Sequence, residues 1–164
     1  MRKGHALTDL PTVPRSLIDA GDFDLSGNIA YLLVRAKNTL SQYVEQGASH
    51  MGLTHAQACC LMMLANGHST TPTELSRRLD IDAGAVTRLV DRMERRGLIT
   101  RSRGEADRRM VHLTLTDEGH AIVQRLPSVF IDVTHRGFAG FSPEEIAMFR
   151  QMLIRVVANG GVAD

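Results

Sequence analysis

In the middle of the chain, two segments with the apolar spacing of short helices are followed directly by two segments in which apolar and polar residues alternate as in strands. Few folds have this order of elements. Thr71, Pro72 and Glu74 form a capping box with proline at the first helical position, which predicts a helix over TELSRRLD. Asp82 is the expected N-cap of a second helix, DAGAVTRLVDRMERRG, whose apolar residues recur at helical spacing. The segments LITRSR and RMVHLTLT then alternate in strand fashion, with GEAD as the turn between them. Two short helices followed by a β-hairpin predict a winged helix-turn-helix.

The remaining segments carry helical patterns with their own start signals. Thr54, Thr116 and Ser142 each stand where a side-chain oxygen would accept from the first turn of a helix. Pro127 lies within the helix that Thr116 begins and predicts a kink, because proline lacks an N–H. The expected fold class is therefore mainly α-helical with one β-hairpin. Outside the winged segment, the expected elements are an N-terminal arm over residues 1–23 and helices over about residues 24–46, 54–66, 117–138 and 142–158.

Composition excludes several classes of protein. The chain has 164 residues, 43% of them hydrophobic, and a net charge of +1, which fits one globular domain. No apolar run approaches the roughly 18–20 residues of a membrane span, and no signal-peptide pattern is present. Cys59 and Cys60 are the only cysteines, which excludes a disulfide framework and favours the reducing cytoplasm. The sequence shows no catalytic triad, phosphate loop, paired carboxylates or metal cluster of suitable spacing, so we expect neither an enzyme nor a cofactor.

Positive charge is concentrated in the winged segment. Residues 77–109 hold ten arginines against six acidic residues, whereas the rest of the chain is slightly acidic. Charged helix faces are usually only solvated faces, so this asymmetry by itself favours nucleic acid modestly. Combined with a helix pair and a hairpin, it favours double-stranded DNA.

The second helix of the winged segment is the expected DNA-reading helix, because its N-terminal residues would reach base edges in the major groove. The small residues Ala83 and Gly84 would allow close approach. Arg88 is suited to bidentate pairing with guanine, and Arg92, one turn further on, to a phosphate. The predicted DNA contacts are Thr73, Ala83, Gly84, Thr87, Arg88, Arg92, Arg103, Arg108 and Arg109.

Arg108 and Arg109 stand at the expected tip of the hairpin, where neither side chain can be buried. A wing beside the reading helix meets the adjacent minor groove, whose negative potential attracts arginine. Asp107 is interpreted as a positioning residue that pairs with one of the two arginines and leaves the other free for DNA.

These segments also resemble a known family. The run LDIDAGAVTRLVDRMERRGLITR, followed by DRRMVHLTLTDEG, is similar to the MarR family of bacterial transcriptional regulators. The segments YLLVRAKNTL and LTHAQ extend the similarity over about residues 24–158. The family's wing signature, D-x-R followed by L-x-L-T-x-x-G, matches at Asp107, Arg109, Leu113, Leu115, Thr116 and Gly119.

The resemblance implies a homodimer in which the first and the last two helices of two copies interlock, so that two winged lobes read a pseudo-palindrome. The last helix agrees with this, because its apolar residues form a face wider than one small lobe covers, although they would also serve to close a monomeric core. The apolar residues are Ile146, Met148, Phe149, Met152, Leu153, Val156 and Val157. The expected organisation is an N-terminal arm (1–23), a dimerisation helix (24–52), a winged helix-turn-helix DNA-binding lobe (53–116) and C-terminal dimerisation helices (117–164).

Members of this family usually bind a small, often anionic aromatic ligand between the dimerisation helices and the winged lobe. The resemblance therefore implies a repressor that such an effector releases, with Arg35 as the candidate partner of a ligand carboxylate. The chain lacks the tryptophan of the urate-responsive branch and has Cys59 where that branch has an aspartate, which argues against urate. The candidate pocket residues are Tyr31, Arg35, His55, Cys59 and Met62, and ordinary surface or core placement explains each of them equally well.

A redox-sensing regulator that uses Cys59 is the alternative within the same fold. A disulfide between Cys59 and Cys60 would be strained, because neighbouring helical side chains diverge by about 100°. A bridge from Cys59 to a second copy stays open, whereas Cys60 falls on the apolar face and is interpreted as a core residue. His55 lies four residues before Cys59, but no third ligand supports a metal site.

An alternative of a different class is a helical protein-interaction module that does not bind DNA. Arg88, Arg108 and Arg109 separate the two hypotheses. If these arginines contact DNA, their loss weakens binding and reduces its salt dependence.

Overall fold

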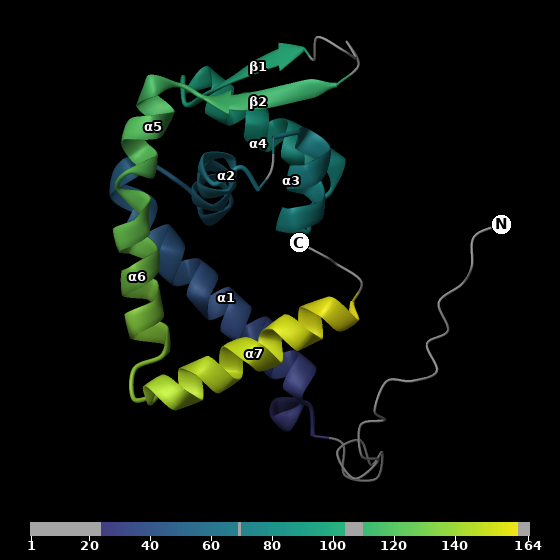
Figure 1. The fold of residues 1–164 in the computed structure, drawn as a ribbon, viewed down its shortest axis with the longest axis vertical. Coiled ribbons are helices and arrows are strands. Elements are labelled where there is room, and N and C mark those ends of the chain that lie inside the picture. The colour runs from purple at the N-terminus through teal and green to yellow at the C-terminus, as the bar shows by residue number, and fades with distance from the viewer. Residues whose placement is uncertain (1–23, 69, 104–109, 161–164) are drawn as a thin grey trace, which may run out of the picture. The chain divides into compact units, whose positions relative to one another are not determined.

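The computed structural model describes residues 24–68, 70–103 and 110–160 (Figure 1). The chain divides within helix α1 into two compact units, residues 1–37 and 38–164. Within the described residues, no helix has the length and apolarity that a membrane span requires. The elements are the 3₁₀ helices η4 (Leu25–Gly27) and η5 (Ser49–Met51), the helices α1 (Ile29–Ala48), α2 (His55–Ala65), α3 (Pro72–Leu79), α4 (Ala83–Arg95), α5 (Asp117–Val123), α6 (Leu126–Gly137) and α7 (Pro143–Asn159), and the strands β1 (Ile99–Arg103) and β2 (Val111–Leu115).

The first unit contains η4 and the N-terminal part of α1. Asp24 caps η4 by accepting from Ser26 N at 3.0 Å, and Asn28 then accepts from Tyr31 N at 3.2 Å. The helix expected from residue 24 therefore begins at Ile29, because a second side-chain cap at Asn28 satisfies the first turn of α1.

In the second unit, α2, α3 and α4 pack with the hairpin β1–β2 (Figure 1), which confirms the winged helix-turn-helix. The strands are antiparallel, and their register runs from the pair Ile99–Leu115 to the pair Arg103–Val111. Leu113 N also donates to Thr70 O at 2.8 Å, which ties β2 to the segment before α3. The largest fully buried side chains are Leu61, Leu75, Val86, Leu89, Val90, Met93, Leu98, Ile99, Leu113, Leu126 and Cys60.

The predicted helix starts are confirmed by side-chain bonds. Thr54, Thr71 and Ser142 each form a complete capping box. Glu74 Oε2 accepts from Thr70 N at 2.7 Å and from Thr71 N at 3.0 Å, and these bonds hold the pKa of the Glu74 carboxyl below its ordinary value. The remaining two predicted caps, Asp82 and Thr116, accept from Ala85 N and Gly119 N.

The single long helix expected over residues 117–138 is wrong, because the structure has two helices there. α5 ends at Val123, and α6 begins at Leu126 with Pro127 in its first turn. The first turn of a helix has amides without partners, so a proline is tolerated there at no loss of a hydrogen bond. Pro127 therefore begins a helix instead of kinking one.

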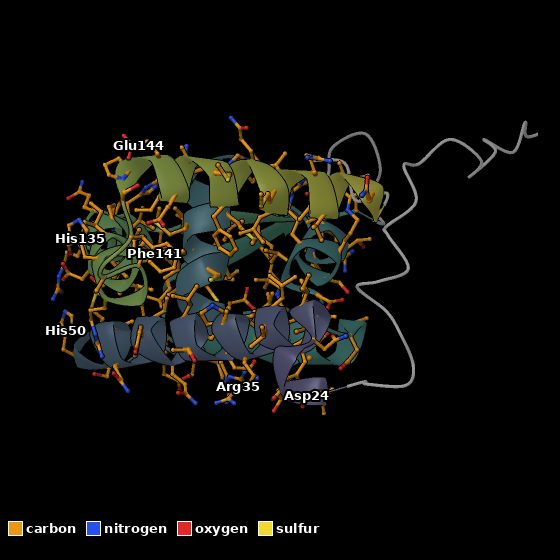
Figure 2. The ribbon with its side chains drawn as sticks, turned by 90° about the horizontal axis from the view of Figure 1, so that it is seen from below. Asp24, Arg35, His50, His135, Phe141 and Glu144 are labelled. Carbon is orange, nitrogen blue, oxygen red and sulfur yellow. The ribbon has the colours of Figure 1, made fainter. Side chains whose placement is uncertain are left out.

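Helix α7 has no buried residue. At its start, the Phe138 ring lies 5.6 Å from the ring of Phe141 and 5.9 Å from that of Phe149, between centroids. Figure 2 shows Phe141 and Glu144 at this corner between α6 and α7. Large apolar side chains of α7 that are about half exposed or more are Met148, Met152, Ile154, Val156 and Val157.

Candidate nucleic-acid interface

Helix α4 is held by one face and leaves the other open. Val86, Leu89, Val90 and Met93 recur at helical spacing, and each is at most 1% exposed. Asp82 Oδ1 accepts from Ala85 N at 2.8 Å and so fixes the first turn without covering it. The N-terminal half of α4 is therefore anchored by its buried face and its cap, and its other face is accessible.

The turn between α3 and α4 sets the angle of the helix pair. Asp80 ends α3 in the left-handed region, with a φ of 53°. Ser76 Oγ donates to Ile81 O at 2.7 Å, and Ile81 N donates to Ser76 O at 3.2 Å. The sequence indicated a turn here, but it did not indicate this pair of bonds or the left-handed residue.

Five predicted DNA contacts lie on α4. Thr87 Oγ1 donates to Ala83 O at 2.9 Å. A β-carbon at Gly84 would lie 3.4 Å from Arg88 Nη1, so the guanidinium extends along the helix to this glycine. We call these five residues the α4 surface: Ala83, Gly84, Thr87, Arg88 and Arg92. All five are exposed.

The remaining predicted contacts come from other elements. Thr73 is exposed in the first turn of α3, and Arg103 is exposed at the last position of β1. Asp107, Arg108 and Arg109 lie outside the described residues, so their roles at the hairpin tip stay predictions.

One arginine of the hairpin is paired with α4. Arg101 Nη2 contacts Asp91 Oδ1, and Arg101 Nε lies 3.3 Å from Glu94 Oε2. We call these three residues the Arg101 network. Sequence reasoning missed it, because the contact depends on how the hairpin folds back toward α4.

A second arginine of the basic segment is occupied by the protein itself. Arg96 Nη1 donates to Gly52 O at 2.5 Å, and Arg96 Nη2 donates to Met51 O at 3.0 Å. These bonds fasten the end of α4 to the loop before α2. The excess of arginine over residues 77–109 therefore overstates the charge that is available to DNA.

The candidate effector residues belong to both units. In the first unit, the Arg35 guanidinium lies 5.9 Å from the centroid of the Tyr31 ring. In the second unit, His55 Nε2 lies 3.4 Å from Cys59 Sγ and 3.5 Å from Ser41 Oγ. Met62 is half-buried against the core of the winged lobe.

The two thiols lie in surroundings that keep them protonated. Burial raises the pKa of Cys59, and burial together with the neighbouring Cys59 raises the pKa of Cys60 to about 12. The thiolate is the reactive form of cysteine, so both side chains are poor nucleophiles at neutral pH. Cys60 is fully buried, which confirms it as a core residue.

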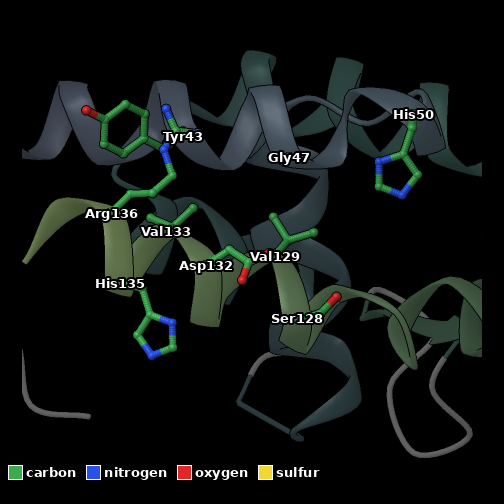
Figure 3. Close-up of a pocket in the computed structure, with 9 residues that line it drawn as sticks. All are labelled: Tyr43, Gly47, His50, Ser128, Val129, Asp132, Val133, His135 and Arg136. Atoms are coloured by element: carbon green, nitrogen blue, oxygen red, sulfur yellow. The ribbon is translucent and has the colours of Figure 1, made fainter. Parts of the chain in front are cut away.

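A groove of about 370 Å³ lies between the C-terminal part of α1 and α6 (Figure 3). The Arg136 guanidinium lies 4.0 Å from the centroid of the Tyr43 ring on one side of it, and Val129 packs against Gly47. Asp132 adds an acid to the same lining. Sequence reasoning missed this groove. Among the described residues, no three His, Cys, Asp or Glu side chains gather to hold a metal ion.

Comparison with known proteins identifies the family. A family model described as the MarR family matches residues 51–110. The HTH-type transcriptional repressor YetL of Bacillus subtilis is 30% identical over 139 residues, which cover 83% of this chain and 80% of that relative. This chain belongs to the MarR family. It is therefore a DNA-binding transcriptional regulator, and the family that its sequence resembles is confirmed.

Solved MarR-family structures share the fold over most of their length. A mutant MarR from Escherichia coli, complexed with operator DNA, superimposes with a TM-score of 0.72 at 25% identity, over 80% of this chain and 95% of that chain. BpsR from Bordetella bronchiseptica, whose DNA binding is regulated by 6-hydroxynicotinic acid, superimposes with a TM-score of 0.72 at 27% identity, over 88% of this chain and all of BpsR.

Proposed function

We propose that this MarR-family protein binds a pseudo-palindromic operator as a homodimer, represses transcription in the cytoplasm, and is released by a small anionic aromatic effector. The observation that carries the proposal is the α4 surface. It joins small residues at a capped helix start to Arg88 and Arg92, which lie one turn apart. A helix presented in this way fits the major groove.

The contacts of one lobe follow from this placement. Arg88, near the N-terminus of α4, pairs with guanine, and Arg92 contacts a phosphate. Thr73 at the start of α3 and Arg103 at the end of β1 reach the backbone on either side. Asp107 holds the hairpin tip so that Arg108 or Arg109 enters the minor groove. Two lobes then read half-sites about 34 Å apart.

The homodimer is supported by the last helix. The apolar side chains of α7 are exposed in the single chain, and an exposed apolar face of this extent is typical of a surface that a second copy covers. We therefore assign residues 24–52 and 117–164 to dimerisation and residues 53–116 to DNA binding.

Arg88→Ala is expected to lower affinity for the operator by about 10- to 100-fold, because a bidentate contact to one base is lost. Arg92→Ala is expected to weaken binding to every duplex and to lower the slope of log affinity against log salt by about one. Fluorescence anisotropy measures both, with a duplex that the wild-type protein selects from a randomised pool and an unrelated duplex of equal length.

Arg125→Ala is the matched control, because Arg125 is exposed in the turn between α5 and α6 and its loss removes the same charge. It should leave affinity and salt slope unchanged. If Arg88→Ala and Arg92→Ala bind the selected duplex as the wild type does, the α4 surface does not contact DNA. A wild-type protein that selects no duplex would instead favour the protein-interaction module.

The effector is tested by a panel of aromatic acids that includes 6-hydroxynicotinate, with hydrogen peroxide as the oxidant. We expect an aromatic acid to lower operator affinity, and Arg35→Gln to weaken that response without changing affinity in the absence of ligand. Peroxide should have little effect, because burial raises the pKa of Cys59. Release by peroxide that Cys59→Ser abolishes would instead establish the redox alternative.

A further inference from the structure

We propose that Arg101 is a positioning residue that sets the angle of the wing against α4, with Asp91 and Glu94 as its partners. The proposal rests on the proposed function, and it adds residues that do not themselves touch DNA. Its starting observation concerns the residues that the structure describes. Among them, the Arg101 network is the ion-pair link between the hairpin and α4, the proposed reading helix.

The geometry suits a link between two elements. Arg101 stands at the middle of β1, opposite Leu113 in the register. Its guanidinium meets carboxylates from two positions of α4 that are three residues apart and therefore share one face. A planar guanidinium that contacts two carboxylates through different nitrogens restrains its own orientation as well as its distance.

Arg103 provides the contrast within the same strand. It lies two residues beyond Arg101, and side chains two apart on a strand share a face. Arg103 is exposed and forms no ion pair with any described residue. One arginine on this face is thus occupied by α4, whereas the next is available to a phosphate.

Stability alone gives a weak reason for the network. Its side chains are 33%, 45% and 41% exposed for Arg101, Asp91 and Glu94, and exposed ion pairs contribute little to folding. Position is a stronger reason. The bond from Leu113 N to Thr70 O holds β2, and the Arg101 network holds β1, so two ties on different strands restrain rotation of the hairpin.

Removal of the two acids tests the proposal, because a charge effect and a positioning effect change DNA affinity in opposite directions. Asp91 and Glu94 lie on the helix that approaches DNA, where a carboxylate repels phosphate. If the acids acted only by charge, their removal would tighten DNA binding. If they position the wing through Arg101, their removal weakens binding to the selected duplex even though the protein becomes more positive.

The experiment compares Arg101→Gln, the pair Asp91→Asn with Glu94→Gln, and all three changes together in the full-length protein. On a duplex selected by the wild-type protein, we expect each of the first two to lower affinity about tenfold, and the triple variant to fall no further, because the three residues act as a unit. Arg101→Lys should recover part of the loss. The salt slope should stay that of the wild type, whereas Arg103→Gln should lower it by about one.

Hydrogen exchange without DNA provides an independent measurement. Arg101→Gln should speed amide exchange in β1 and β2 and leave α2 unchanged, whereas Arg103→Gln should leave all three unchanged. Tighter DNA binding after removal of the acids, a lower salt slope for Arg101→Gln, or unchanged exchange in its hairpin would each overturn the proposal. If the wild-type protein selects no duplex, the proposed function fails, and hydrogen exchange still decides whether Arg101 holds the wing.

Discussion

Alanine in place of Gly119 is expected to lower the free energy of unfolding by about 3 kcal/mol or more. Gly119 is buried in the first turn of α5, and a β-carbon there would lie 2.1 Å from the carbonyl oxygen of Leu98. That oxygen also accepts from Thr116 N at 3.1 Å, so it cannot move away without breaking this bond. Because the clash is with backbone, no side-chain rotation relieves it. Urea denaturation followed by circular dichroism measures the loss.

Gly27→Ala is the matched control for this change. A β-carbon at Gly27 would meet only the Asp24 carboxylate, at 3.8 Å, so the free energy of unfolding should change by no more than about 0.5 kcal/mol. A Gly119→Ala protein as stable as the wild type would contradict the close approach of α5 to the α4–β1 junction.

Glutamate at both Met148 and Met152 is expected to convert the dimer into monomers. The two side chains lie four residues apart on α7, and they are 58% and 49% exposed in the single chain. A second copy that covers them would bury two unpaired carboxylates from each protomer, which is strongly unfavourable. In a dimer, binding of one lobe raises the effective concentration of the second lobe at its half-site, and separate monomers lose this effect. Affinity for the selected duplex should therefore fall by about 100-fold or more. Sedimentation velocity and fluorescence anisotropy measure the two effects.

Leucine at the same two positions is the control, because it keeps the apolar surface and the helical propensity. This variant should remain dimeric and bind as the wild type does. Helical content should persist in the glutamate variant, since neither methionine is buried within its own chain. A glutamate variant that still sediments as a dimer would mean that α7 does not form the interface.

The helix starts and the buried and exposed faces of α4 could be predicted because their causes are local. A capping box spans four residues, so Thr54, Thr71 and Ser142 announce their helices within a short stretch of sequence. The buried face of α4 likewise follows from its own periodicity. The exposure of the α4 surface follows for the same reason, since the residues opposite a buried stripe face solvent, whereas its contact with DNA stays a prediction.

Contacts between distant residues could not be predicted in this way. Arg96 donates to Gly52 O across 44 positions, and the sequence shows only that Arg96 belongs to a basic run. The sequence shows Gly119 only as part of a family signature. The physical reason for a glycine at this position is the carbonyl oxygen of Leu98, which lies next to it only in the folded chain. The division of α5 from α6 was missed because a proline inside a helix and a proline at a helix start look alike in sequence. They differ only in whether the residues before the proline are helical.

The bond from Leu113 N to Thr70 O makes the segment between α2 and α3 a neighbour of the sheet. A shift of that segment acts on the β2 backbone directly and need not pass along α4. The Arg101 network ties the same hairpin to α4, so a displacement of the hairpin would also act on that helix. Thr70 is therefore a point outside the sheet at which a change would reach the hairpin.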